Sequence, residues 1–161
     1  MSVITLTFDS PRVGAGAAES WDKVAGLEAG KIREIDLRYK LFKTEVIFEA
    51  GGVELIDGFR LTLVDLALGV MTAVERLKSE EDSAISFTES ADVIYFDNLG
   101  DIVQVRYLVG NRVERVVAYV SIAELLKAMH AFVKNVYERL TTDFPGLAEN
   151  PVIQRLAPRK H

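Results

Sequence analysis

The sequence predicts an α+β domain in which a largely antiparallel sheet of about six or seven strands packs against two main helices. In residues 121–140, apolar side chains recur at helical spacing over about five turns. In residues 61–78, apolar side chains also follow a helical period and cover a wider arc. Residues 84–120 contain short β-prone segments separated by turn residues. Because both helices need a cover for their apolar sides, we expect them to pack on these strands.

The helix expected at 121–140 has clear signals at both ends. Ser121 can accept a hydrogen bond from the first turn, and Glu124 lies three residues further on, as in a capping box. Phe144 and Pro145 should end the helix, because the residue before a proline avoids the α region.

The helix expected at 61–78 begins with a candidate capping pair, Thr62 and Asp65. Its apolar residues extend well beyond a single stripe. A helix of this kind is usually covered on more than one side, so we expect it to lie inside the domain.

Strands are also expected before this helix. Residues 3–8 alternate and are rich in β-prone residues. Residues 32–48 form a long β-prone region with a bulge or a turn near Phe42. A turn at 50–52 would lead to a short returning strand at 53–56. The residues that would share the apolar face of the long region are Ile35, Leu37, Tyr39 and Leu41.

Four short strands are expected between the two helices. The turns that join them have lengths that suit antiparallel neighbours, so the strands should form a meander with one face on the core. Tyr119 is expected on that core face. The four strands are 84–88, 93–96, 102–108 and 113–120.

The whole chain, residues 1–161, is expected to be one domain of this class. Residues 12–30 are loop-rich, with one short helix. Towards the other end, Asn150 followed by Pro151 should cap a last short helical turn, and the tail 157–161 should fray. No internal repeat is apparent at the periods of solenoid proteins.

Composition and charge argue against several classes of function. The chain has 161 residues, 49% of them apolar, no cysteine and a formal net charge of −5. The acidic balance argues against nucleic-acid or anionic-membrane binding, because phosphate-rich surfaces attract basic proteins. The absence of cysteine excludes disulfides and thiolate metal sites. The first residues lack a signal-peptide pattern and no segment is apolar enough to span a bilayer, so we expect a cytoplasmic protein.

No motif predicts catalysis, and we expect no cofactor and no metal. Gly14 and Gly16 suggest a dinucleotide loop, but Glu19 stands where the third glycine would be, which favours a plain loop. His130 has no second histidine or cysteine near it, so a structural histidine is favoured over a metal ligand or a base. The acidic segment 97–101 does not have the spacing of a calcium loop and indicates a turn.

Acidic residues gather on the loops that follow the 61–78 helix. Because alternate loops of a meander fall at the same edge, we expect Glu80–Asp82 beside Asp97–Asp101, and Glu89 with Asp92 at the opposite end. One interpretation is a solvated rim that keeps the protein soluble. The other is an acidic docking face for a basic partner. The candidate partner-binding residues are Glu80, Glu81, Asp82, Glu89, Asp92, Asp97 and Asp101.

Four segments within residues 31–156 together carry a resemblance to a known family: IDLRYKLFKTEVIF, LVDLALGVMTAVERL, ISFTESADVIYF and HAFVKNVYERLTTDFPGL. In pattern, order and length they resemble the small α+β immunity proteins of bacterial polymorphic toxin systems. The resemblance implies a protein that binds and blocks a toxin domain, often with an acidic face against a basic enzyme. It brings no catalytic residues with it.

The leading hypothesis is therefore a non-enzymatic protein-binding module, and toxin immunity is its most concrete form. One alternative is an enzyme or small-ligand-binding protein with a pocket between the sheet and the helices. Another is a homo-oligomeric structural protein, which excess apolar surface on residues 61–77 would favour. The residues expected to line a pocket are Tyr95, Tyr107, Arg106 and Asp92.

Overall fold

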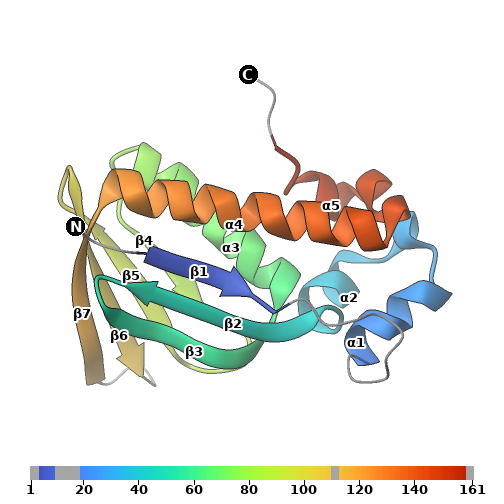
Figure 1. Cartoon of the computed structure of the whole chain (residues 1–161), viewed down its shortest axis with the longest axis horizontal. Coiled ribbons are helices and arrows are strands. Elements are labelled where there is room, and N and C mark those ends of the chain that lie inside the picture. Colours follow the sequence, from blue (N-terminus) through green and yellow to red (C-terminus); the bar gives the residue numbers. More distant parts are fainter. Residues whose placement is uncertain (1–3, 10–18, 110–112, 159–161) are drawn as a thin grey trace.

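The computed structural model describes residues 4–9, 19–109 and 113–158, which form an α+β fold with two antiparallel sheets and two long helices (Figure 1). The first sheet consists of β1 (Ile4–Phe8), β2 (Lys43–Ala50) and β3 (Val53–Thr62), in that order. The second sheet consists of β4 (Ser83–Ser86), β5 (Val93–Asn98), β6 (Ile102–Val109) and β7 (Val113–Ser121), also in that order. The long helices are α3 (Leu63–Lys78) and α4 (Ile122–Asp143).

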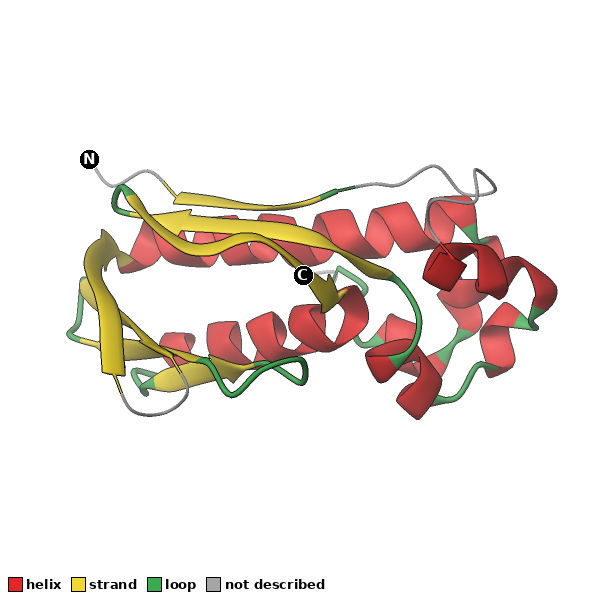
Figure 2. Cartoon of the chain, turned by 90° about the horizontal axis from the view of Figure 1, so that it is seen from below, coloured by secondary structure: helices red, strands yellow, loops and turns green. Residues whose placement is uncertain are grey.

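The expectation of one continuous sheet is wrong, because the seven described strands fall into two sheets. The last strand of each sheet is followed directly by a long helix: α3 follows β3, and α4 follows β7. The two sheets contact each other through side chains, since the rings of Phe48 and Phe96 stack with their centroids 6.4 Å apart. Their backbones also come close, because a β-carbon added to Gly51 would lie 3.5 Å from the β-carbon of Ala118. Figure 2 shows the first sheet running along α4 and the second sheet at one end of the molecule.

The β2–β3 hairpin with α3 and the β6–β7 hairpin with α4 repeat one arrangement, shifted along the chain by a constant number of residues. Lys43 pairs with Thr62 where the first hairpin meets α3, and Ile102 pairs with Ser121 where the second hairpin meets α4. We call β1–β3 with α3 the first half, and β5–β7 with α4 the second half. The same shift aligns buried helix residues, matching Leu66, Val70, Ala73, Val74 and Leu77 of α3 with Leu125, Met129, Phe132, Val133 and Val136 of α4.

The long strand expected over 32–48 is wrong in its first part, because helix α2 (Glu34–Tyr39) lies there. Leu37 is buried, but Ile35 and Tyr39 are 51% and 40% exposed. The alternation therefore does not mark a sheet face. Ion pairs at i,i+4 spacing favour the helix instead. They join Glu34 to Arg38 and Asp36 to Lys40.

The starts and ends of the long helices follow the sequence signals only in part. Ser121 caps α4 by accepting a hydrogen bond from the Glu124 amide at 3.4 Å, as expected. The side chain of Thr62 does not cap α3, which starts later than expected because β3 continues to Thr62. Helix α4 ends before Phe144, again as expected.

The region 19–42 packs at the C-terminal end of α4. It contains α1 (Glu19–Asp22) and the 3-10 turns η1 (Lys23–Gly26) and η2 (Ala29–Lys31), and the first two match the expected short helix. The rings of Trp21 and Phe42 meet edge-to-face at 4.9 Å, and Phe42 contacts Phe144 at 5.7 Å. Phe42 has a φ of 55°, which forms the expected turn into β2.

Asn150 joins this region to the C-terminal turns η3 (Pro145–Glu149) and α5 (Pro151–Gln154). Its side-chain oxygen accepts from the Val152 amide, so it caps α5 as expected. Its side-chain nitrogen donates to the carbonyls of Ala29 and Ile32, both at 3.0 Å. These bonds explain how a polar side chain with 0% exposure is tolerated. The Gly14–Gly16 loop and residues 159–161 of the tail lie outside the described residues.

Candidate functional site

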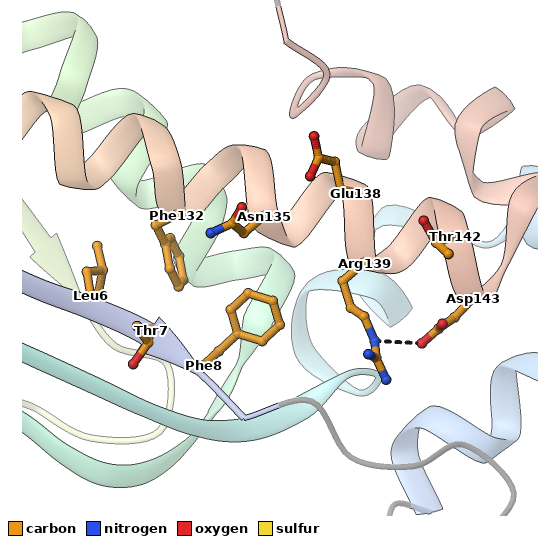
Figure 3. Close-up of a pocket in the computed structure, with 9 residues that line it drawn as sticks. All are labelled: Leu6, Thr7, Phe8, Phe132, Asn135, Glu138, Arg139, Thr142 and Asp143. Carbon is orange, nitrogen blue, oxygen red and sulfur yellow. Dashed lines mark ion pairs between the residues drawn. The ribbon is translucent and has the colours of Figure 1, made fainter.

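A pocket of about 440 Å³ lies between β1 and α4 (Figure 3). Its apolar side is formed by Leu6, Phe8 and Phe132, and the two phenylalanine rings meet edge-to-face at 5.9 Å. At its polar end Arg139 points toward Asp143, and Nε and Oδ2 form an ion pair at 2.7 Å. Glu138 also lines the pocket, and its carboxylate pairs with Lys134 at 3.8 Å, so the charged groups of this pocket have partners.

The outer face of the second sheet is a second candidate. We define it by Tyr95, Asp97, Ile102, Gln104, Arg106 and Tyr119, which are partly or fully exposed. Neighbouring residues on the same strands point inward. Ile94, Phe96, Val103, Val105, Ala118 and Val120 are all buried. Tyr119 is 59% exposed and Ile102 is 47% exposed. The expectation that Tyr119 faces the core is wrong, because pairing with β6 turns Ala118 and Val120 inward.

The centre of this outer face is held by a fixed ion pair. Arg106 donates two hydrogen bonds to the carboxylate of Asp97, one of them at 3.0 Å. Its guanidinium also lies 4.9 Å from the ring centroid of Tyr95. Bidentate pairing and stacking on a ring restrict an arginine to one geometry, so this part of the surface is rigid.

Four of the predicted acidic residues lie together at one edge of the second sheet. We call Glu80, Glu81, Asp82 and Asp101 the acidic corner, and all four are exposed. Asn98 holds the corner together: its amide donates to Asp82 at 2.7 Å, and its side chain donates to the Leu77 carbonyl at the end of α3. The corner adjoins two exposed apolar side chains, because Leu99 is 60% exposed and Ile102 follows Asp101 directly.

Within the acidic corner Glu81 pairs with Arg76 at 3.9 Å, and the other predicted acidic residues also have partners. Glu89 accepts from the amide and hydroxyl of Thr62 at 2.9 and 2.7 Å. Asp92 accepts from the Tyr107 hydroxyl at 2.6 Å. Both lie at the end of the sheet opposite the acidic corner, as the meander pattern predicts, and Asp97 is the partner of Arg106.

The residues predicted to line a pocket are divided between the two faces of the second sheet. Tyr95 and Arg106 belong to the outer face described above. Tyr107 and Asp92 line a pocket of about 200 Å³ on the other face. Ile56 and Leu61 of β3 line the same pocket, which therefore lies between the two sheets and not between a sheet and the helices.

Sequence reasoning missed Leu99, Ile102 and Tyr119 as surface residues. The sequence did indicate an exposed Ile102, because alternate residues of a strand share one face and Ile102 alternates with the polar Gln104 and Arg106. Tyr119 gave no such signal, because it lies in an unbroken run of apolar residues, 116–120.

The described residues contain no group of three or more histidine, cysteine or acidic side chains arranged to hold a metal ion. Within the same part of the chain, no helix combines the length and apolar character needed to cross a membrane. No family model matches the chain, and neither the curated proteins nor the solved structures include one significantly similar to it.

Proposed function

We propose that this chain is a non-enzymatic protein-binding module that binds a basic protein domain through the acidic corner and the outer face of the second sheet. Its most concrete form is an immunity protein that neutralises a toxin domain in the cytoplasm. The proposal joins two neighbouring surfaces, since Asp101 of the acidic corner directly precedes Ile102 of the outer face, and Ile102 pairs with Ser121, two residues from Tyr119.

The observation that carries the proposal is a comparison of equivalent positions in the two halves. Lys43, Glu45 and Arg60, which are exposed on the first sheet, correspond to Ile102, Gln104 and Tyr119 on the second. Charged residues are the usual composition of a solvated sheet face. At two of these three positions the second sheet has an exposed apolar or aromatic residue, Ile102 or Tyr119, which is typical of a surface with a partner. At a further equivalent pair the first sheet has the exposed isoleucine, Ile47, and the second sheet has Arg106.

The composition of this surface indicates how a partner would be held. Tyrosine and arginine are enriched among residues that dominate interface energies, and a rigid base favours them further. Tyr119, Ile102 and Leu99 would bury their exposed parts against an apolar patch of the partner. The carboxylates of the acidic corner would attract basic residues around that patch and accelerate the encounter.

A direct test mixes the purified chain with toxin domains encoded beside its gene and measures affinity by calorimetry. For a domain that binds, Tyr119→Ala should weaken affinity about 30-fold, the loss typical of an aromatic anchor. Tyr39→Ala is the matched control, because Tyr39 is also exposed but lies on α2. Equal effects of the two substitutions would contradict the proposal.

The acidic corner is tested by charge reversal. Glu81→Lys and Asp101→Lys should slow association, and raising the salt concentration should reduce the difference from the unaltered protein. Glu45→Lys, at an exposed position of the first sheet, is the control, since it changes the net charge by the same amount. The proposal fails if no neighbouring toxin domain binds, or if Glu45→Lys slows association as much as the corner variants do.

A further inference from the structure

The pocket of about 200 Å³ between the two sheets lies at the opposite end of the second sheet from the acidic corner. We propose that it binds a free α-amino acid with an apolar side chain. This site is independent of the proposed protein-binding surface, because none of the residues that define that surface lines the pocket.

The floor of the pocket is apolar and already formed. Ile56 and Leu61 of β3 are 2% and 5% exposed, and Tyr107 of β6 is 4% exposed. Phe87, on the loop between β4 and β5, adds a partly buried ring at the side. Apolar walls with a few polar groups are typical of small-ligand sites. The volume is below the roughly 300–1,000 Å³ of sites for drug-sized ligands, so a small metabolite fits and a nucleotide does not.

Residues of opposite charge line this pocket, and the described residues show no ion pair between them. Arg60 of β3 lines it, and within the described part of the chain its guanidinium has no hydrogen bond or ion pair. Glu89 lines it from the β4–β5 loop and uses only Oε1 for its two bonds with Thr62. Its second carboxylate oxygen has no partner among the described residues. The pocket thus presents an unengaged cation and an unengaged anionic oxygen.

A second carboxylate lies beside the first. Asp92 lines the pocket and is fixed by the hydroxyl of Tyr107 at 2.6 Å. An ammonium group offers three donors, which suits the second oxygen of Glu89 in a pocket that Asp92 also lines. A ligand carboxylate suits the planar fork of Arg60, which can donate two parallel hydrogen bonds.

This distribution of charge selects the chemical class of the ligand. A simple anion would meet two carboxylates, and a simple amine would leave Arg60 without a partner. A zwitterion satisfies both sides at once, and the apolar floor requires a hydrocarbon side chain on it. These are the features of leucine, isoleucine, valine, methionine or phenylalanine as free amino acids.

The loop that carries Glu89 is held in place before any ligand arrives. Thr88 donates to Asp65 on α3 at 2.8 Å, and Glu89 itself is tied to Thr62 at the end of β3. A site that is ordered in advance loses less conformational entropy on binding. The pocket is therefore a preformed receptor and not one that a ligand has to assemble.

The test is a titration of the full chain, without any toxin domain, followed by nuclear magnetic resonance and calorimetry. L-Leucine and L-phenylalanine should give saturable shifts of amides in β3, β6 and the β4–β5 loop. Leucinamide, which lacks the carboxylate, and N-acetyl-leucine, which lacks the ammonium group, should each bind at least about tenfold more weakly, as expected for loss of a charged hydrogen bond.

Two variants separate recognition from folding. Arg60→Gln and Glu89→Gln should each weaken leucine binding about tenfold. The glutamine at 89 can still accept both bonds from Thr62, so the fold is retained. Lys31→Gln and Glu28→Gln, which remove the same charges from an exposed ion pair beside η2, should leave binding unchanged. The inference is overturned if no amino acid binds saturably, if N-acetyl-leucine or leucinamide binds as well as leucine, or if the pocket variants bind as well as the controls.

Discussion

The two halves of the molecule begin their helices with equivalent residues that have different roles. Ser121 accepts a hydrogen bond from the Glu124 amide and so caps its own helix, α4. Thr62, at the equivalent position, gives both its amide and its hydroxyl to Glu89 on the β4–β5 loop. The first amide of each helix also bonds to a carbonyl before the preceding hairpin, Ile122 to Asp101 and Leu63 to Phe42. The difference lies in the capping residue, which bonds within its own helix in α4 and to the β4–β5 loop in α3.

The helices themselves show the same contrast. Nine residues of the 16-residue α3 are buried, against six of the 22 in α4. Helix α3 packs on α4, on β4 and on α2, so it is covered on several sides, as its wide apolar arc predicts. Helix α3 thus contributes a larger share of its residues to the interior of the domain than α4 does.

Asp65 also ties the start of α3 to other segments of the chain. It lies in the first turn of α3, where its carboxylate pairs with Arg38 of α2 at 2.7 Å and accepts from Thr88 at 2.8 Å. Burial acts to lower the pKa of Arg38. The hydrogen bond to Asp65 acts in the opposite direction, and the pKa lies above its ordinary value. Glu34 continues the chain of contacts from Arg38 to Arg155. Three segments are thereby joined through the start of α3.

The largest expected effect tests the equivalence of the two halves. Leu66→Ala in α3 and Leu125→Ala in α4 remove the same side chain from matching buried positions. Each should lower the free energy of unfolding by about 3 kcal/mol through lost burial and the cavity left behind. Urea denaturation of both variants measures this. A loss below about 1 kcal/mol at either position would show that the two cores are not equivalent.

The next effect tests the difference between the helix starts. Asp65→Ala should cost about 2 kcal/mol, because it leaves Arg38 and Thr88 without their partly buried acceptor. Glu124→Ala, at the equivalent half-buried position of α4, should cost about 0.5 kcal/mol. Thermal denaturation at neutral pH compares the two. Equal losses would mean that α3 is not anchored through Asp65.

A smaller effect isolates the bond between Thr62 and Glu89. Thr62→Val removes the hydroxyl and should cost about 1 kcal/mol. In a double-mutant cycle with Glu89→Ala, Thr62→Val should show a coupling energy of about 1 kcal/mol. Ser121→Ala in the same cycle should show none, since its hydroxyl is used within α4. If Glu89 coupled to Ser121 as strongly as to Thr62, the two helix starts would not differ in their partners.

The smallest expected effect concerns exposed positions that are equivalent in the two sheets. Ile102→Lys with Tyr119→Arg gives the second sheet the residues that the first sheet has at equivalent positions. Because both side chains are exposed, the free energy of unfolding should change by no more than about 0.5 kcal/mol. Partner binding should be lost under the proposed function. A large loss of stability in the free protein would instead mean that these residues support the fold.

Local signals predicted the second half better than the first. Ser121, Glu124 and the Phe144-Pro145 stop define α4 from neighbouring residues alone, and the four strands of the second sheet follow from turns between short segments. Helix α2 was missed because odd-numbered apolar residues mimic a strand while the same stretch carries i,i+4 ion pairs. The division into two sheets was missed because it depends on pairings between distant strands.

The candidate site was predictable to a similar degree. The meander pattern placed Glu80–Asp82 beside Asp97–Asp101 and put Glu89 at the other end. It gave no indication that Thr62, Tyr107 and Arg106 would engage three of the acidic residues, because those contacts depend on register and on the packing of one sheet against the other. The exposed position of Tyr119 also depends on the register with β6.

The contacts of Phe144 and Asn150 bear on how the chain is synthesised. The ring of Phe42 packs on Phe144, and the carbonyls of Ala29 and Ile32 are satisfied by Asn150, which is made more than one hundred residues later. The first half can pair its strands as it leaves the ribosome, but region 19–42 cannot complete its packing until residues 144–150 have emerged. A nascent or truncated chain therefore presents the aromatic surface of Trp21 and Phe42 to chaperones and proteases, and the full-length chain hides it.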